Sequence, residues 1–349
     1  MAVKREHIGE VKNGEPVYAY HLTNRAGMSV VVLNLGATLR DIIVPAKDGT
    51  FVDVCLGQAD LAGYYKNPGN LGAVIGPVAN RTANARYVID GKEHTLPVNE
   101  NGVNNLHSDD EVYGFQRKVW DAAETDNGVT FSISVPDGEL DCPGNREVSV
   151  TYSLSEENEL KLHYHATSDQ NTGLNLTNHV YFNLRGHDSG KITDHVMQLF
   201  ASHYLPVHPG GIPTGELAPV AGTPFDFTMP KEIGKEIDAD IEQLKIVKGG
   251  YDHNYCVDGA DGTLREIAVT TCPTTGITMH TLSDLPGVQF YAGNNLVLAK
   301  AKGGASYSKH DAFCLETQYF PNSLNEQGFE KPVFGPGREL DTTTVYRFD

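Results

Sequence analysis

The chain has 349 residues, with 27 Lys and Arg against 45 Asp and Glu, which gives a formal net charge of −18 at pH 7. No block of Lys or Arg could follow a phosphate backbone or an anionic membrane surface, so we expect neither nucleic acid nor a membrane as a partner. Short segments rich in Val, Thr, Tyr and Phe, separated by 36 Gly and 18 Pro, predict an all-β protein with few short helices.

The N-terminal residues 1–7 lack the apolar core of a signal peptide, and no apolar run approaches the roughly 20 residues that span a bilayer. We therefore expect a cytoplasmic protein. The five cysteines are an odd number without a C-x-x-C pair, which disfavours both a disulfide framework and a structural zinc site. We expect reduced, mostly buried thiols at Cys55, Cys142, Cys256, Cys272 and Cys314.

Turn signals recur between short β-type runs, without an internal repeat, a low-complexity tract or a linker. They lie at residues 47–49, 90–91, 137–138, 208–211 and 258–259. This rhythm is typical of a large antiparallel sandwich, and we expect one continuous domain over residues 1–349. The longest predicted helix spans residues 231–245, where isoleucines and a leucine recur on one side.

Histidines occur in two contrasting settings in the first half of the chain. A hairpin-like region at residues 87–97 is followed by a turn-rich loop that carries His107 among acidic neighbours. Such a histidine is usually a solvated surface group, yet loops on a rigid sheet are also where binding groups gather. Both interpretations stay open. His163 and His165 share one strand face, but the sequence shows no third ligand that would make them a metal site.

The most informative segment is Asn175–Leu184, whose alternation with period two predicts a strand. Its polar face carries Asn175, Thr177, His179, Tyr181 and Asn183. Its other face is predicted to be core and carries Leu176, Asn178, Val180, Phe182 and Leu184. A surface of amide, hydroxyl, imidazole and phenol groups suits a hydroxyl-rich ligand such as a sugar. A strand histidine taken alone, however, is more often a hydrogen-bonded structural residue than a catalyst.

Glu316 lies between apolar and aromatic neighbours in Asp311–Pro321, a segment with the pattern of a buried strand. Desolvation would raise the pKa of its carboxyl group, which makes Glu316 a candidate base. The alternative is a glutamate at a strand edge that pairs with a lysine or bonds to a turn. Aromatic residues that could form a sugar-stacking wall, or belong to the core, are Tyr251, Tyr255, Phe290 and Tyr291.

Six motifs, in the same order along the chain, resemble those of the aldose 1-epimerases, or galactose mutarotases. Residues 177–184, Thr-Asn-His-Val-Tyr-Phe-Asn-Leu, resemble the family signature that carries a catalytic histidine, here His179. Residues 314–318, Cys-Leu-Glu-Thr-Gln, resemble its catalytic glutamate motif, here Glu316. Four shorter motifs resemble its binding positions: Ala79-Asn80-Arg81, Asn105-Leu106-His107, Gly250-Tyr251-Asp252 and Gly287-Val288-Gln289.

The resemblance implies the β-supersandwich fold of that family and its activity, the interconversion of the α and β anomers of free hexoses such as galactose and glucose. It implies that Glu316 as a carboxylate takes the proton of the C1 hydroxyl while His179 as an imidazolium protonates the ring oxygen, O5. It implies contacts to the sugar from Asn80, Arg81, His107, Tyr181, Asp252 and Gln289. The expected partner is a monosaccharide, and no metal or organic cofactor is required.

Two departures from the family pattern lie near the expected site. Pro77 follows Gly76 where the family usually has an arginine, and Ser108–Glu111 stand where a Gly-Gly pair commonly follows the loop histidine. We expect the first change to weaken anchoring near the site and the second to alter substrate preference. The alternatives are a hexose-6-phosphate 1-epimerase, disfavoured by the missing arginine and the acidic chain, and a noncatalytic sugar-binding module, disfavoured by the presence of both acid and base.

Overall fold

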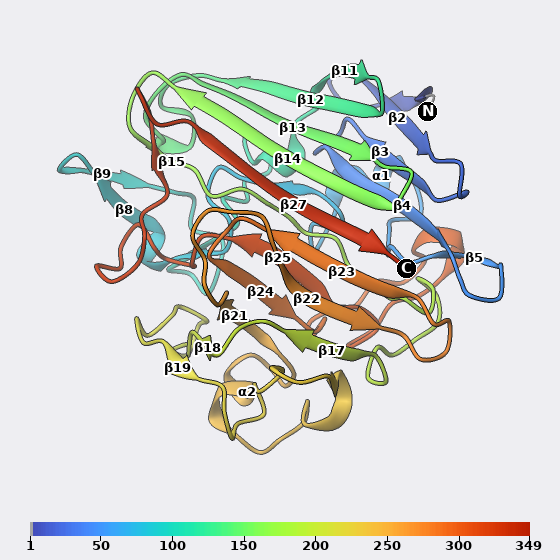
Figure 1. The fold of residues 1–349 in the computed structure, drawn as a ribbon. Coiled ribbons are helices and arrows are strands. Elements are labelled where there is room, and N and C mark those ends of the chain that lie inside the picture. The colour runs from blue at the N-terminus through green and yellow to red at the C-terminus, as the bar shows by residue number, and fades with distance from the viewer. Residues whose placement is uncertain (1–2) are drawn as a thin grey trace.

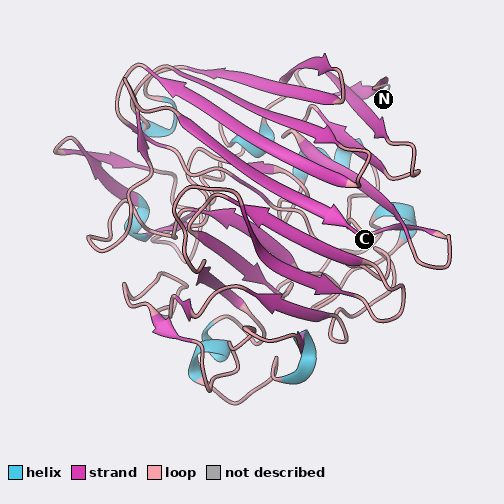
Figure 2. Cartoon of the chain, viewed as in Figure 1, coloured by secondary structure: helices cyan, strands magenta, loops and turns pink. Residues whose placement is uncertain are grey.

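The computed structural model describes residues 3–349, and most of its regular structure is antiparallel β-sheet (Figure 1 and Figure 2). Two α-helices occur among these residues, α1 (Leu61–Lys66) and α2 (Glu242–Ile246). The 3-10 helices are single turns at Ala83–Ala85, Phe115–Arg117, Glu139–Asp141, Ile233–Lys235 and Lys302–Gly304. The prediction of an all-β sandwich with few short helices is confirmed.

The largest sheet has nine strands in the order β11-β12-β13-β14-β27-β23-β22-β17-β20. Their bounds are β11 (Asp121–Thr125), β12 (Gly128–Val135), β13 (Arg146–Leu154), β14 (Glu159–Ser168), β27 (Leu340–Phe348), β23 (Thr278–Ser283), β22 (Arg265–Thr271), β17 (Val196–Leu199) and β20 (Lys231–Glu232). In Figure 1 the red β27 lies between the green β14 and the orange β23. The C-terminal strand therefore joins strands from the two halves of the chain.

A second sheet has five strands in the order β19-β18-β21-β24-β25. Their bounds are β19 (Ala218–Pro219), β18 (His203–Tyr204), β21 (Asp252–Cys256), β24 (Gly287–Tyr291) and β25 (Cys314–Gln318). The sheet packs against the nine-stranded sheet, since the hydroxyl of Tyr346 on β27 donates to the carbonyl of Leu315 on β25 at 3.2 Å. Every residue of β24 and of β25 is buried, so both faces of these strands are covered.

The N-terminal region forms another five-stranded sheet with its strands in sequence order. These strands are β1 (Lys4–Glu10), β2 (Pro16–Thr23), β3 (Ser29–Leu33), β4 (Thr38–Pro45) and β5 (Phe51–Asp53). Short two-stranded pairs complete the sheets: β6 (Val74–Ile75) with β16 (Thr177–Asn178), β7 (Arg81–Thr82) with β10 (Asn105–Leu106), β8 (Arg86–Ile89) with β9 (Lys92–Thr95), and β15 (Thr172–Gly173) with β26 (Val333–Phe334). The hairpin predicted at residues 87–97 corresponds to β8 and β9.

Residues 175–184 do not form the predicted ten-residue strand. Only Thr177 and Asn178 pair as a strand, with β6, and Asn175 and Phe182 make isolated bridges to other loops. The segment finds its backbone partners in several loops rather than in one neighbouring strand. The predicted core face is nevertheless largely confirmed, because four of its members lie in the main hydrophobic core: Leu176, Val180, Phe182 and Leu184.

The helix predicted at residues 231–245 is wrong over most of its length. Residues 231–232 form β20, and helix α2 begins only at Glu242. Gly234 packs against the backbone of Thr193, and its amide donates to that residue's carbonyl at 2.8 Å. This tertiary contact replaces a helical hydrogen bond, while Ile233 and Ile237 still reach the core through irregular backbone.

All five cysteines are free and buried, as predicted. Within residues 3–349, no helix has the length and apolar character required to cross a bilayer.

Candidate active site

The floor of the site is formed by one face of β21, β24 and β25. Asn254, Gln289 and Glu316 lie opposite one another across these three strands. Because side chains alternate along a strand, this row points to one face, while the intervening row points to the other. That other face carries Tyr255, Phe290 and Leu315, and all three belong to the main hydrophobic core. The strand period therefore presents polar groups to the site and apolar groups to the sandwich interior.

His179 faces this floor from the extended segment after β16. Its amide donates to the carbonyl of Ala73 at 2.9 Å, and its carbonyl accepts from the amide of Gly72 at 2.9 Å. The imidazole stacks on the ring of Tyr181, with a centroid separation of 4.9 Å and an interplanar angle of 14°. The Tyr181 hydroxyl in turn donates to the carbonyl of Gly69 at 3.0 Å. Backbone and stacking contacts together fix the plane of the His179 ring.

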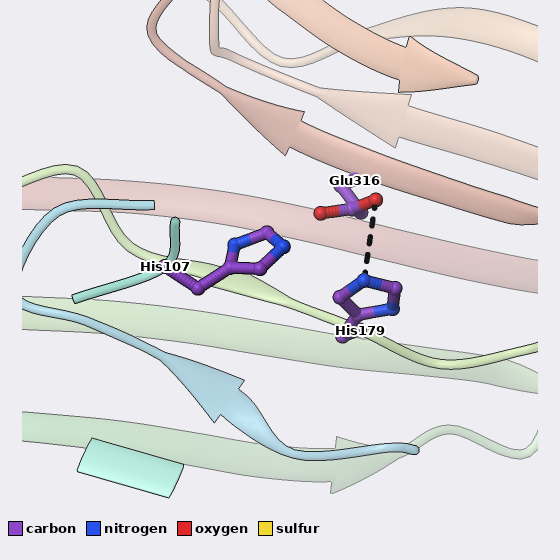
Figure 3. Close-up of side chains that lie close together, drawn as sticks. All are labelled: His107, His179 and Glu316. Atoms are coloured by element: carbon purple, nitrogen blue, oxygen red, sulfur yellow. Dashed lines mark ion pairs between the residues drawn. The ribbon is translucent and has the colours of Figure 1, made fainter. Parts of the chain in front are cut away.

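The Nε2 of His179 lies 3.7 Å from Oε1 of Glu316, and the two side chains are only 7% and 3% exposed (Figure 3). The second carboxyl oxygen, Oε2, has no hydrogen-bond partner among the described residues. Burying an oxygen without a hydrogen-bond partner costs free energy unless a ligand or the proton of the carboxyl group satisfies it. The pair therefore combines an acid and a base with one carboxyl oxygen that is free to bond a ligand, as a proton-transfer site requires.

Burial moves the pKa values of the two groups in opposite directions. Desolvation raises the pKa of Glu316 well above its usual value, and nearby Asp252 adds to this while Arg81 opposes it. Desolvation also lowers the pKa of His179 to about 4, against a smaller opposing effect of a hydrogen bond with its own backbone. The sequence led us to expect an imidazolium beside a carboxylate. In the free site burial instead favours a neutral imidazole and a protonated carboxyl group, because both charged forms are desolvated.

His107 reaches the site from the turn after β10, with a positive φ of 62°. Its amide donates to the carbonyl of Asn80 at 2.9 Å, and the amide of Asn80 donates to Nδ1 of His107 at 3.1 Å. An accepting Nδ1 leaves the proton of the neutral ring on Nε2, the nitrogen that faces His179 and Glu316 (Figure 3). The residue is buried, so of the two interpretations left open the solvated one is wrong.

One ligand atom from each of His107, His179 and Glu316 lies within 4.8 Å of the others, a spacing from which a metal site could be built. A metal would need the lone pair of the His107 nitrogen that faces the site. That nitrogen carries the proton while Asn80 occupies Nδ1, so the three groups do not fit a common metal ion. His163 and His165 each pair with a different carboxylate instead, Asp341 at 2.9 Å and Glu339 at 3.0 Å.

A charged network borders the acid–base pair. Nε of Arg81 donates to both carboxylate oxygens of Glu100 at 3.1 Å, and its Nη2 lies 3.6 Å from Oδ2 of Asp252. Gln289 donates from Nε2 to Oδ1 of Asp252 at 2.7 Å. Asp252 is thus held from two sides, and the charge of Arg81 is shared by two carboxylates.

These groups meet at a cavity of about 260 Å³. Its lining residues are Gly69, Asn70, Asn80, Arg81, Leu106, His107, Asp109, His179, Tyr181, Asp252, Tyr291, Asn295 and Glu316. Seven of the eight residues predicted for the site are among them, and the exception is Gln289, which contacts Asp252 instead. A larger hollow of about 730 Å³ lies near Lys12 and Arg117, and neither His179 nor Glu316 is among its lining residues.

Several lining residues were missed by the motif comparison. Tyr291 follows Gln289 by two positions on β24 and therefore shares its face, a signal that strand alternation provides. Asn70 and Asn295 lie in loops, where the sequence offers no comparable signal. Of the other aromatic candidates, Tyr251, Tyr255 and Phe290 belong to the main core.

The two departures from the family pattern are both anchored by local hydrogen bonds. The carbonyl of Pro77 accepts from the amide of Asn175 at 2.8 Å. The hydroxyl of Ser108 accepts from the amide of Val78 and donates to its carbonyl, both at 3.0 Å. Asp109 pairs with Arg117 at 2.8 Å. These contacts hold the loop that brings Asp109 to the cavity.

Comparisons with known proteins agree with this geometry. The chain matches the sequence model of the family described as Aldose 1-epimerase over residues 18–347. It is 40% identical over 348 residues to the galactose mutarotase of Homo sapiens, covering 99% of this chain and 98% of that protein. It is 37% identical over 339 residues to the aldose 1-epimerase of Escherichia coli (strain K12), covering 96% of each.

Solved structures give the same result. The galactose 1-epimerase from Lactobacillus acidophilus NCFM is 28% identical and superposes with a TM-score of 0.85, covering 100% of this chain and 99% of that one. An aldose epimerase homologue from C. elegans is 26% identical, with a TM-score of 0.86 and 99% coverage of both chains. The chain belongs to the aldose 1-epimerase family.

Proposed function

We propose that the chain is an aldose 1-epimerase, an isomerase that interconverts the α and β anomers of free hexoses such as galactose and glucose. The observation that carries the proposal is the buried pair of His179 and Glu316, 3.7 Å apart at a cavity lined by hydrogen-bonding groups. Relatives named galactose mutarotase and aldose 1-epimerase align over nearly the whole chain and support it.

In this mechanism Glu316 removes the proton of the C1 hydroxyl while His179 gives a proton to O5. The ring opens, the carbonyl at C1 rotates, and reclosure on its other face reverses both transfers. The pair carries one proton before and after each step, first on the imidazole and then on the carboxyl group. Hydrogen bonds from the sugar stabilise the charged arrangement that burial disfavours in the free site. Each positioned group contributes about 10²- to 10⁴-fold to the rate.

The other groups of the cavity bind and orient the sugar in this proposal. His107 is a neutral donor through Nε2, because the amide of Asn80 keeps its Nδ1 as an acceptor. Asp252 accepts from ring hydroxyls, and Gln289 acts through Asp252, to which it donates at 2.7 Å. The side chains of Asn80, Arg81 and Tyr181 complete the binding surface. No metal or organic cofactor takes part in this scheme.

A hexose-6-phosphate epimerase would need a cation free to bind the phosphate group. Among the residues that line the cavity, the only Lys or Arg is Arg81, and Glu100 and Asp252 already share its charge. A noncatalytic sugar-binding module would have no use for a matched acid and base. A cytoplasmic location and the absence of nucleic-acid partners stay predictions.

The proposal is tested with freshly dissolved α-D-glucose and α-D-galactose, by polarimetry or a coupled anomer assay. The parent chain, Glu316→Gln and His179→Ala are compared under identical conditions. We expect a parent that accelerates anomerisation of at least one sugar and two variants that have lost most of this activity. A parent inactive on both sugars, or a variant with full activity, would contradict the proposal. The relative rates also give the preferred sugar, which the family membership leaves open.

A further inference from the structure

The two histidines of the site differ in the partner of Nδ1. In His107 this nitrogen accepts from the backbone amide of Asn80 at 3.1 Å. In His179 it lies 3.5 Å from Sγ of Cys314. A backbone amide can only donate, whereas a thiol can donate weakly or accept weakly. His107 is therefore fixed with its proton on Nε2, while the partner of His179 permits a proton on Nδ1.

The proposed mechanism requires a particular proton on His179. Its Nε2 faces Glu316 and must lose a proton to O5 and regain it later. Through both halves of that cycle the ring stays neutral or cationic only if Nδ1 keeps its own proton. A proton on buried Nδ1 needs an acceptor. Among the side chains of residues 3–349, the hydrogen-bond partner of this nitrogen is Cys314, and the imidazole also has a hydrogen bond with its own backbone.

We propose that Cys314 is a positioning residue, whose sulfur accepts a hydrogen bond from Nδ1 of His179 and so makes Nε2 the nitrogen that exchanges its proton with the sugar. The inference rests on the proposed function. In ring opening the O1–H bond breaks as a Glu316 O–H bond forms, the C1–O5 bond breaks as the C1–O1 double bond forms, and the Nε2–H bond breaks as O5–H forms. Cys314 neither gains nor loses a proton.

The placement of Cys314 follows from the strand that carries the base. Cys314 and Glu316 are two positions apart on β25, so both side chains point to the same face. Sγ of Cys314 lies 3.5 Å from Nδ1, and Oε1 of Glu316 lies 3.7 Å from Nε2. Two side chains of the same strand therefore lie beside the two nitrogens of the imidazole. The rings of Tyr181, Tyr291 and His107 enclose the remaining sides.

A thiol suits an acid better than a carboxylate would at this position. A carboxylate on Nδ1 makes an imidazole more basic and its cation a weaker acid. Burial raises the pKa of Cys314 well above its usual value, helped by nearby Glu316 and Asp252, so the group stays a neutral thiol. Such a weak acceptor orients the ring without stabilising the imidazolium. His179 then remains acidic enough to protonate a sugar ring oxygen, which is a weak base.

The test combines kinetics with the ¹⁵N NMR spectrum of histidine-labelled protein, in which the signals of His179 are assigned by their loss in His179→Gln. The variants are Cys314→Ala, which removes the acceptor, and Cys314→Ser, which replaces it with a hydroxyl group. Cys272→Ala is the matched control, since Cys272 is equally buried in the main core away from the site. Thermal unfolding of each variant shows that it is folded at the assay temperature.

We expect Cys314→Ala to lower kcat about 10- to 100-fold, the range found when the outer hydrogen-bond partner of a metal-bound imidazole is removed, with KM changed much less. The parent should show neutral His179 with its proton on Nδ1, Cys314→Ala should show a mixture of tautomers, and Cys314→Ser should restore both kcat and the parent tautomer. Cys272→Ala should match the parent in kcat.

The proposal is overturned if Cys314→Ala keeps the parent kcat, or if its kcat falls while the tautomer of His179 stays unchanged. A parent spectrum with the proton on Nε2 of neutral His179 would overturn it as well. The tautomer is read without any sugar. A parent that is inactive on both sugars but shows the expected spectra would therefore contradict the proposed function and leave the Nδ1 contact supported.

Discussion

Two histidine–carboxylate pairs in this molecule have similar chemical groups but differ in solvent exposure. His163 on the nine-stranded sheet lies 2.9 Å from Asp341, and the side chains are 37% and 66% exposed. His179 lies 3.7 Å from Glu316, and the side chains are 7% and 3% exposed. The closer pair is solvated, so water screens its charges. The wider pair is desolvated, and burial shifts both of its pKa values. Burial, rather than contact distance, distinguishes the catalytic candidate.

The two sheets explain this difference. On β13 and β14 buried residues alternate with more exposed ones, so one face of the large sheet reaches solvent. On β24 and β25 every residue is buried, and the row that faces away from the core is polar. Polar groups on such strands are satisfied by one another or by a ligand, because water has little access. The pKa values of an acid and a base are therefore shifted on a sheet that is covered on both sides and has one polar face.

The largest expected effect is on catalysis. His179→Ala and Glu316→Gln should each lower kcat by about 10²- to 10⁴-fold, because each removes one of the two proton transfers. His163→Ala and Asp341→Asn are the matched controls from the solvated pair and should leave kcat within about twofold of the parent. Initial anomerisation rates measure these effects. Equal losses of kcat at both pairs would show that burial does not distinguish the catalytic pair.

The second prediction concerns stability against pH. The pKa of His179 is lowered to about 4 from a normal value of 6.5, mainly by burial. As pH falls from 6.5 toward 4, the unfolded chain binds a proton at this residue and the folded chain does not, so folding loses stability. Each pKa unit corresponds to about 1.4 kcal/mol, so the loss is about 3 kcal/mol.

His179→Gln removes this contribution, and its free energy of unfolding should fall less steeply than that of the parent between these pH values. Urea unfolding at several pH values measures the slope. His163→Gln serves as the control and should follow the parent curve. If His179→Gln also follows the parent curve, the imidazole is not held neutral by burial.

The third prediction separates binding from proton transfer. Asp252→Asn removes a carboxylate that faces the cavity, and a hydrogen bond to a charged group contributes about 1.5–3 kcal/mol. We expect kcat/KM to fall about 10- to 100-fold. Asp252 also raises the pKa of Glu316, so the ionisation of that base in the pH profile should move to lower pH in the variant. An unmoved profile would show that the two carboxylates do not interact.

The smallest effect is expected at the solvated pair. His163→Gln should change the free energy of unfolding at pH 7 by less than about 1 kcal/mol, as is usual for exposed ion pairs. Urea unfolding at low and at high salt measures it. A loss several times larger would mean that the solvated pair contributes more than its exposure allows, and the contrast between the two settings would need another cause.

The residues that meet at the cavity were predicted from the sequence better than the backbone that carries them. The apolar neighbours of Glu316 predicted a buried strand correctly, since both faces of β25 are covered and the pattern is continuous. Residues 175–184 alternate like a strand but pair mostly with loops, which a local pattern does not reveal. The apolar spacing at residues 231–245 likewise predicted a helix, where contacts to Thr193 and to the core decide the backbone instead.

The electrostatic details depended on distant partners. The amide of Asn80 determines which nitrogen of His107 carries the proton. The sequence alone did not decide whether His107 lies at the surface or in the site. The sequence motif also did not show that Nε2 of Gln289 donates to Asp252, a contact set by cross-strand geometry. The contact between Cys314 and His179 joins segments that no local pattern relates. Sequence motifs identify the residues of the site, whereas the protonation states of these residues depend on the neighbours against which they pack.

If His179 and Glu316 share one proton, they act as a unit, and a variant that changes both residues tests whether they do. Anomerisation rates are compared for the parent, His179→Ala, Glu316→Gln and the variant that carries both changes. Groups that act as a unit show losses that are far from additive. We expect the double variant to be about as slow as the slower single variant. A double variant slowed by the full product of the two single losses would contradict it.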